Sequence, residues 1–177
     1  MNLPNKLTIA RMIAVPFFIA AYLFGYYPAA LVIFVVASVT DYFDGKIARS
    51  QNLVTNFGKI MDPLADKILV YSALCLFIES DIIRAWMLIL ILAREFIVAG
   101  MRTVAASEGT VLAAGMSGKI KTVLQMVSVI LFLFALCLTD AKPTVMMVAN
   151  VIFWASLVMT VYSGTEYVLK NRSVFSM

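Results

Sequence analysis

The longest uncharged stretch of the sequence, Met12–Thr40, has 29 residues without an Asp, Glu, Lys or Arg. A helix that crosses a bilayer needs about 20 apolar residues, so this stretch is too long for one crossing helix and too short for two. It is interrupted near its middle at Gly25–Pro28, and Gly and Pro are typical of turns. Each half must therefore extend into the charged residues that lie beyond the stretch.

The composition places the chain among membrane proteins. Of its 177 residues, 63% are hydrophobic and 14% are charged, whereas about 25% are charged in a soluble domain. The apolar stretches predict an all-α integral membrane protein with a single domain over residues 1–177 and six transmembrane helices. These helices are expected from residues 3–7 to the Gly25 break, then near 28–48, 61–78, 83–105, 118–138 and 143–164. The second would carry Asp41 and Asp44 in its last two turns.

The distribution of Lys and Arg predicts the orientation of these helices. Six crossings put both termini on one side, and 12 of the 14 Lys and Arg residues fall on that side, leaving Arg84 and Lys142 on the other. Cytoplasmic segments of membrane proteins carry an excess of Lys and Arg. Both termini are therefore predicted to be cytoplasmic, and this bias accounts for the net charge of +4 without a nucleic-acid partner.

Two other features of the composition exclude classes of site. The chain has no His, which excludes Ser-His-Asp triads and zinc sites with His ligands. Cys75 and Cys137 lie inside apolar stretches and are expected to be buried core thiols. No disulfide framework is predicted from them.

Four aspartates stand close together in this mostly apolar chain. Asp41 and Asp44 are three residues apart, and Asp62 and Asp66 are four apart. On helices, both spacings place the two members of a pair on one face, so two neighbouring helices can form one anionic pocket. Oxygen ligands without His or Cys suit Mg²⁺, Mn²⁺ or Ca²⁺, and two divalent ions would balance four carboxylates. Sites with two metal ions are typical of phosphoryl transfer.

The spacing of the aspartates alone leaves two other interpretations open. Asp and Arg residues can form ion pairs that lock two helices together, or they can line a cation or proton path in a transporter. The transporter interpretation is weakened by depth, because the cluster is predicted at one membrane face, whereas transporter sites lie near the midplane.

The residues around the aspartates resemble the signature of a known family, the CDP-alcohol phosphotransferases. All eight positions of that signature are present, as Asp41-x2-Asp44-Gly45-x2-Ala48-Arg49-x8-Gly58-x3-Asp62-x3-Asp66. Three shorter motifs resemble the phosphatidylglycerophosphate synthase branch of the family: Pro4-Asn5-x-Leu7-Thr8-x2-Arg11, Arg94-Glu95-Phe96 with Arg102, and Gly118-Lys119-x-Lys121-Thr122-x2-Gln125.

The resemblance implies an enzyme of phospholipid biosynthesis. It would transfer the phosphatidyl group of CDP-diacylglycerol to the 1-hydroxyl of sn-glycerol 3-phosphate and release CMP. It would act as a homodimer. The plasma (inner) membrane is its expected location, and the distribution of Lys and Arg predicts that its active site faces the cytoplasm. Carried over position by position, two divalent ions, Mg²⁺ or Mn²⁺, would be held by Asp41, Asp44, Asp62 and Asp66, and Asp66 would also be the general base. CDP would be contacted by Asn5, Thr8, Gly45, Ala48, Arg49 and Gly58.

The phosphate of such an acceptor needs cations to bind it. The candidates are Arg94, Arg102, Lys119, Lys121 and, in reserve, Arg11. The alternative for the two lysines is ordinary cytoplasmic charge, and the alternative for Arg94 is an ion pair with Glu95 or a neighbouring helix. These cations favour a phosphorylated acceptor over serine, and inositol phosphate remains an alternative to glycerol 3-phosphate. A cation or proton transporter remains the alternative from another functional class.

Overall fold

The computed structural model describes residues 3–50, 56–110, 112–113 and 115–172. Within these ranges, only the backbone is described for residues 3–6, 41–50, 56–60, 62–63 and 66. The described residues form six α-helices and no strand, which confirms the predicted all-α class. The helices are α1 (Leu3–Leu23), α2 (Tyr27–Ser50), α3 (Asn56–Glu79), α4 (Ala85–Ser107), α5 (Met116–Leu136) and α6 (Lys142–Lys170).

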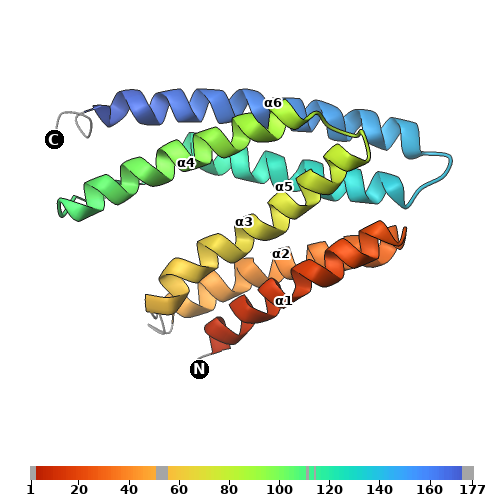
Figure 1. The fold of residues 1–177 in the computed structure, drawn as a ribbon, viewed down its shortest axis with the longest axis horizontal. Helices are drawn as coiled ribbons and strands as arrows, with labels where there is room; N and C mark the ends of the chain where they lie inside the picture. Colours follow the sequence, from red (N-terminus) through yellow and green to blue (C-terminus); the bar gives the residue numbers. More distant parts are fainter. Residues whose placement is uncertain (1–2, 51–55, 111, 114, 173–177) are drawn as a thin grey trace.

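The six helices form two groups that pack side by side (Figure 1). In the first group, α1 packs along both α2 and α3, and in the second, α6 packs along both α5 and α4. The two groups meet where α2 contacts α5 and where α3 contacts α4 and α5. Successive helices run in opposite directions, so the two ends of the chain lie at the same end of the bundle (Figure 1).

Aromatic side chains fill the centre of the bundle. Phe132 of α5 is fully buried between Phe77 of α3 and Phe153 of α6, with ring centroids 5.3 Å and 5.9 Å away. Both pairs have the edge-to-face geometry that aromatic rings prefer. This stack of three rings joins one helix of the first group to two helices of the second.

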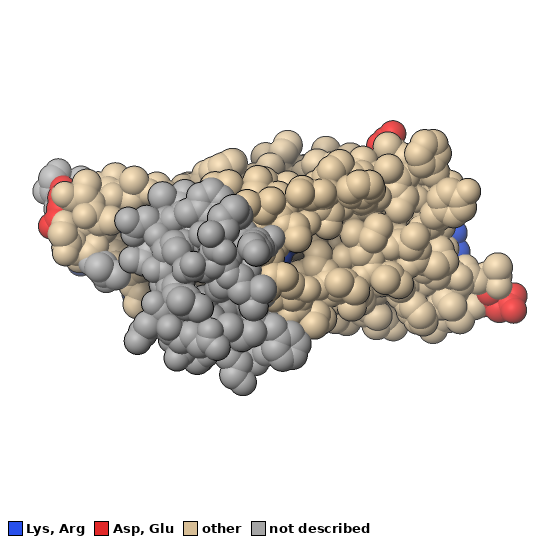
Figure 2. Space-filling model, turned by 90° about the horizontal axis from the view of Figure 1, so that it is seen from below, with Lys and Arg blue, Asp and Glu red and all other residues tan. Residues whose placement is uncertain are grey.

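The outer surface of the bundle is also apolar. Large hydrophobic side chains face outward on several helices, among them Phe96 (71% exposed), Met147 (70%) and Val158 (64%). On the face in Figure 2, most of the charged side chains in view lie toward the two ends. Soluble proteins rarely expose apolar patches of this extent. Among the described residues, α5 and α6 are long and apolar enough to cross a membrane, and the chain has the character of a membrane protein.

The aspartate segments of the chain have helical backbone. The prediction that Asp41 and Asp44 belong to a helix is confirmed, because α2 continues to Ser50. The predicted start of the third helix near Met61 was wrong, because α3 begins at Asn56. The length of an apolar stretch sets only a minimum for a helix, and residues 56–60, which include the polar Asn56 and Lys59, have helical backbone too.

The expectation of two buried thiols was also wrong in part. Cys75 is exposed on α3, and Cys137 is partly exposed just after the end of α5. The outer surface of this bundle is itself apolar, so a position inside an apolar stretch does not predict whether a side chain faces inward or outward.

We expect Phe132→Ala to destabilise the protein strongly, because the cavity that it leaves removes contacts with two buried rings. The free energy of unfolding should fall by about 2 kcal/mol, less than in a soluble core, because both faces of a membrane helix are apolar. Thermal unfolding in detergent checks this. The matched control is Phe134→Ala on the same helix, where the ring is 44% exposed. Equal losses from the two variants would contradict the described packing.

Candidate active site

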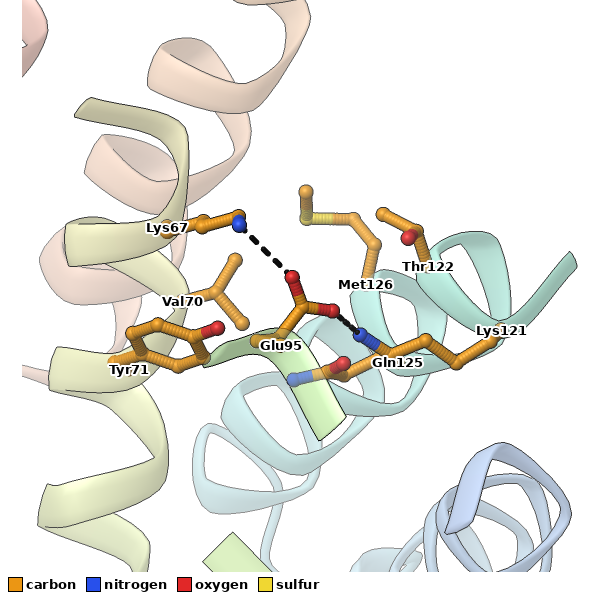
Figure 3. A pocket seen from close by; sticks show the side chains of 8 residues that line it. All are labelled: Lys67, Val70, Tyr71, Glu95, Lys121, Thr122, Gln125 and Met126. Carbon is orange, nitrogen blue, oxygen red and sulfur yellow. Dashed lines mark hydrogen bonds and ion pairs between the residues drawn. The ribbon is translucent and has the colours of Figure 1, made fainter. Parts of the chain in front are cut away.

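Three helices bring charged side chains together around the carboxylate of Glu95 (Figure 3). Lys67 of α3 lies 2.8 Å from Glu95 Oε2, and Lys121 of α5 lies 2.5 Å from Glu95 Oε1. Glu95 itself belongs to α4. One carboxylate therefore links α3, α4 and α5, and both of its oxygens are engaged.

A third cation reaches the same carboxylate from the neighbouring position of α4. Arg94 Nη1 lies 3.2 Å from Glu95 Oε1, the oxygen that also accepts from Lys121. Burial differs among the three cations: the side chain of Lys121 is 4% exposed, that of Arg94 14% and that of Lys67 40%. Burying a charge is unfavourable in free energy unless the charge is paired. The ion pair with Glu95 therefore offsets the burial of the Lys121 charge.

The cluster borders a small cavity of about 90 Å³ between α3, α4 and α5. Its wall combines the two lysines and Glu95 with three more polar groups, one amide and two hydroxyls, and with two apolar side chains. The lining residues are Lys67, Val70, Tyr71, Glu95, Lys121, Thr122, Gln125 and Met126. Figure 3 shows the Lys67 and Lys121 amines approaching the Glu95 carboxylate from opposite sides. A cavity with cations in its wall is suited to an anion.

The candidates for phosphate binding do not all lie in this cluster. Lys121 lines the cavity, and Arg94 contacts Glu95 without lining the cavity. Arg102 lies two turns further along α4, where its Nε donates to Tyr167 Oη at 3.2 Å. Lys119 is exposed, and residues two apart on a helix point to different faces, so it turns away from Lys121. Arg11 is buried in α1.

Most of the candidates for metal and CDP binding lie where side chains are outside the description: Asn5, Asp41, Asp44, Gly45, Ala48, Arg49, Gly58, Asp62 and Asp66. Thr8 is described and is buried in α1. Among the described side chains, no three His, Cys, Asp or Glu residues gather as metal ligands. The backbone places the two aspartate pairs on consecutive helices, toward the end of α2 and in the first half of α3.

Lys67 belongs to the cluster but is not among the phosphate ligands predicted from the sequence. It directly follows Asp66 in α3, so the cation cluster begins next to the aspartate segment along the chain. The signal was present in the sequence, because an ionisable residue inside a predicted membrane helix is a functional candidate by default. Its partner could not be inferred from the sequence, because Glu95 lies 28 positions further along the chain.

Comparisons of the sequence with a family model and with individual proteins indicate the same family. The family model for CDP-alcohol phosphatidyltransferase matches residues 1–162. A protein of Bacillus subtilis named CDP-diacylglycerol–glycerol-3-phosphate 3-phosphatidyltransferase is 42% identical, over 96% of this chain and 95% of its own length. Proteins with the same name from Rickettsia felis (37% identical, 98% and 97%) and Shigella flexneri serotype 5b (35%, 97% and 96%) also match. The chain belongs to the CDP-alcohol phosphatidyltransferase family.

Proposed function

We propose that the protein transfers the phosphatidyl group of CDP-diacylglycerol to sn-glycerol 3-phosphate and releases CMP. The 1-hydroxyl oxygen of the acceptor forms a bond to the phosphorus of the phosphatidyl group. The bond between that phosphorus and the bridging oxygen of the diphosphate breaks, and CMP leaves with this oxygen. Asp66 takes the hydroxyl proton. Relatives named for this reaction cover nearly the whole chain, which supports the proposal.

The four aspartates Asp41, Asp44, Asp62 and Asp66 would hold two divalent cations, Mg²⁺ or Mn²⁺. A donor set made of carboxylates alone fits these ions. When bound, the ions neutralise the diphosphate and favour the departure of CMP. Around them, Asn5, Thr8, Gly45, Ala48, Arg49 and Gly58 would contact the CDP moiety.

The observation that carries the choice of acceptor is the group of cations around Glu95. Lys67, Arg94 and Lys121 bring three positive charges to one carboxylate, so these four groups have a net charge of +2. A phosphate monoester carries a charge of about −1.5 to −2 at pH 7. The phosphate of the acceptor therefore complements this cluster, whereas serine does not supply a dianion. We propose that Lys67 and Lys121, which line the cavity, bind the phosphate, and that Arg94 acts through Glu95.

The position and size of the cavity agree with a short acceptor. Lys67 follows Asp66 directly in α3, so the phosphate site and the proposed base are adjacent in the chain. The cavity of about 90 Å³ is small beside the 300–1,000 Å³ or so of typical ligand pockets. A three-carbon acceptor suits it better than the six-membered ring of inositol phosphate, which remains the alternative. Arg102, Lys119 and Arg11 remain predicted phosphate ligands of second rank.

We further propose that all six helices cross the plasma membrane, with both termini and the active site on the cytoplasmic side. The apolar outer surface and the excess of Lys and Arg on one side support this arrangement. CDP-diacylglycerol would then enter from the bilayer and glycerol 3-phosphate from the cytoplasm. The protein would work as a homodimer, as the family resemblance implies.

The first test measures CMP release by purified protein with CDP-diacylglycerol and Mg²⁺ or Mn²⁺, with glycerol 3-phosphate, inositol phosphate and serine offered in turn. We expect release with glycerol 3-phosphate alone and none after chelation of the metal. Asp66→Asn should lower the rate by a factor of about 10² or more, because it removes the proposed base and a metal ligand.

The matched control is Asp140→Asn, in the exposed turn between α5 and α6, which should retain the wild-type rate. Release with inositol phosphate instead would keep the family and contradict the proposed acceptor. Metal-independent release, or no release from folded protein with any acceptor, would overturn the proposed function.

A second prediction concerns the phosphate site. Lys121→Gln should raise KM for glycerol 3-phosphate by about tenfold or more, because it removes a charged hydrogen bond in a buried site. KM for CDP-diacylglycerol should change little. Steady-state kinetics with each substrate varied in turn checks this, and Lys142→Gln, at the first residue of α6, is the control for loss of one lysine. Equal changes in both KM values would argue against a separate phosphate site.

A further inference from the structure

Arg94 lies in a narrow slot between α5 and α6 that two glycines form. A Cβ atom built on Gly164 of α6 would lie 2.9 Å from Arg94 Cγ, and one built on Gly118 of α5 would lie 3.0 Å from Arg94 Nη2. Both distances are shorter than an ordinary contact between heavy atoms of about 3.5–4.0 Å. A side chain at either position therefore requires Arg94 to move.

The neighbours of these glycines indicate why the positions are small. Small residues in membrane helices usually allow two backbones to approach closely. Outside its own helix, however, the described heavy atoms within 4 Å of a Cβ at Gly164 are Cγ and Cβ of Arg94, and at Gly118 the one such atom is Arg94 Nη2. The two glycines therefore make room for one arginine side chain and not for a neighbouring backbone.

The slot also accounts for the direction of the guanidinium group. Arg94 Nη1 donates to Glu95 Oε1 at 3.2 Å, whereas the buried Nε has no hydrogen-bond partner among the described residues. A buried donor without a partner is unfavourable, so hydrogen bonding through Nε does not hold the side chain here. Besides the bond from Nη1 to Glu95, packing against Gly118 and Gly164 is what holds the side chain in this direction.

We propose that Gly118 and Gly164 are positioning residues for binding of the acceptor. They hold Arg94 against Glu95, and Glu95 in turn sets the positions of Lys67 and Lys121 in the cavity wall. This inference rests on the proposed function of that cavity as the site of the acceptor phosphate. An apolar groove of about 330 Å³ between α4 and α6, lined by Arg94 and Gly164 among others, gives a displaced arginine a place to move away from Glu95.

The test compares three Gly→Ala variants in helices. Gly164→Ala displaces the stem of Arg94 and should raise KM for glycerol 3-phosphate about tenfold, as expected for a disturbed charged contact. Gly118→Ala meets the flexible tip of the side chain and should raise it less, about threefold. Gly100→Ala in α4 is the control, because a Cβ there meets nothing within 4 Å. KM for CDP-diacylglycerol should stay within about twofold of the wild-type value in all three.

Stability provides a second measure. Ala favours a helix more than Gly does. A Gly→Ala variant whose new methyl group displaces no neighbour should therefore unfold at the same or a higher temperature in detergent. If Gly164→Ala does not fold, Gly118→Ala still tests the proposal, because it asks for a smaller movement. Unchanged KM for glycerol 3-phosphate in both variants, with Arg94→Ala raising it, would overturn the slot and leave the proposed function intact.

The double variant separates action through Arg94 from any other effect. In the Arg94→Ala background, a Cβ at position 164 no longer meets the arginine stem, so Gly164→Ala should cause no further rise in KM for glycerol 3-phosphate. A further rise would overturn the proposal. If Arg94→Ala leaves this KM unchanged, both the slot and the assignment of the Arg94–Glu95 pair to the acceptor site are wrong, while transfer to glycerol 3-phosphate stands.

Discussion

The centre of this structure depends on one carboxylate. Glu95 accepts from Lys67, Arg94 and Lys121, which come from three different helices. Without it, three positive charges would repel one another between apolar helices, and Lys121 would be buried without a counterion. Because α3 otherwise packs mainly along α1, this ionic cluster is one of the links between α3 and the other half of the bundle.

The aromatic stack and the ionic cluster connect α3 and α5 at two different levels of the bundle. Phe77 and Phe132, in the C-terminal parts of these helices, bring the two together through ring contacts. Lys67 and Lys121, in their N-terminal parts, leave a cavity between the helices and meet through Glu95. Tight packing at one level therefore fixes the helices, so that a polar cavity can be kept open at the other.

The sequence predicted the fold class and the aspartate helices because the length of an apolar stretch limits where a membrane helix can end. The same reasoning placed the start of α3 too late, because it takes no account of polar residues with helical backbone. Arg94 and Lys121 were predicted as cations for the acceptor phosphate, and both lie beside Glu95. Arg102 was predicted in the same way and shares a face with Glu95 in α4, yet it bonds to Tyr167.

Side-chain contacts between helices could not be predicted from the sequence. The pairing of Lys67 with Glu95 depends on how α3 and α4 cross, and no spacing along the chain records that crossing. The fit of Arg94 between Gly118 and Gly164 depends in the same way on three helices at once. The exposure of Cys75 could not be predicted for a related reason. When the outer surface of a bundle is also apolar, hydrophobicity no longer distinguishes the inner face of a helix from its outer face.

Lys67 and Asp66 are consecutive residues of one rigid helix, separated by about 1.5 Å along its axis. Any tilt or slide of α3 carries both residues together, so the covalent chain fixes the distance between the backbone of the proposed base and that of one lysine proposed to bind the phosphate. In the proposed reaction, α3 therefore selects an acceptor by the distance between its phosphate and its reacting hydroxyl. Glycerol 2-phosphate has the same atoms as glycerol 3-phosphate, but its phosphate is on the adjacent carbon, so its hydroxyl would not reach the proposed base at that distance.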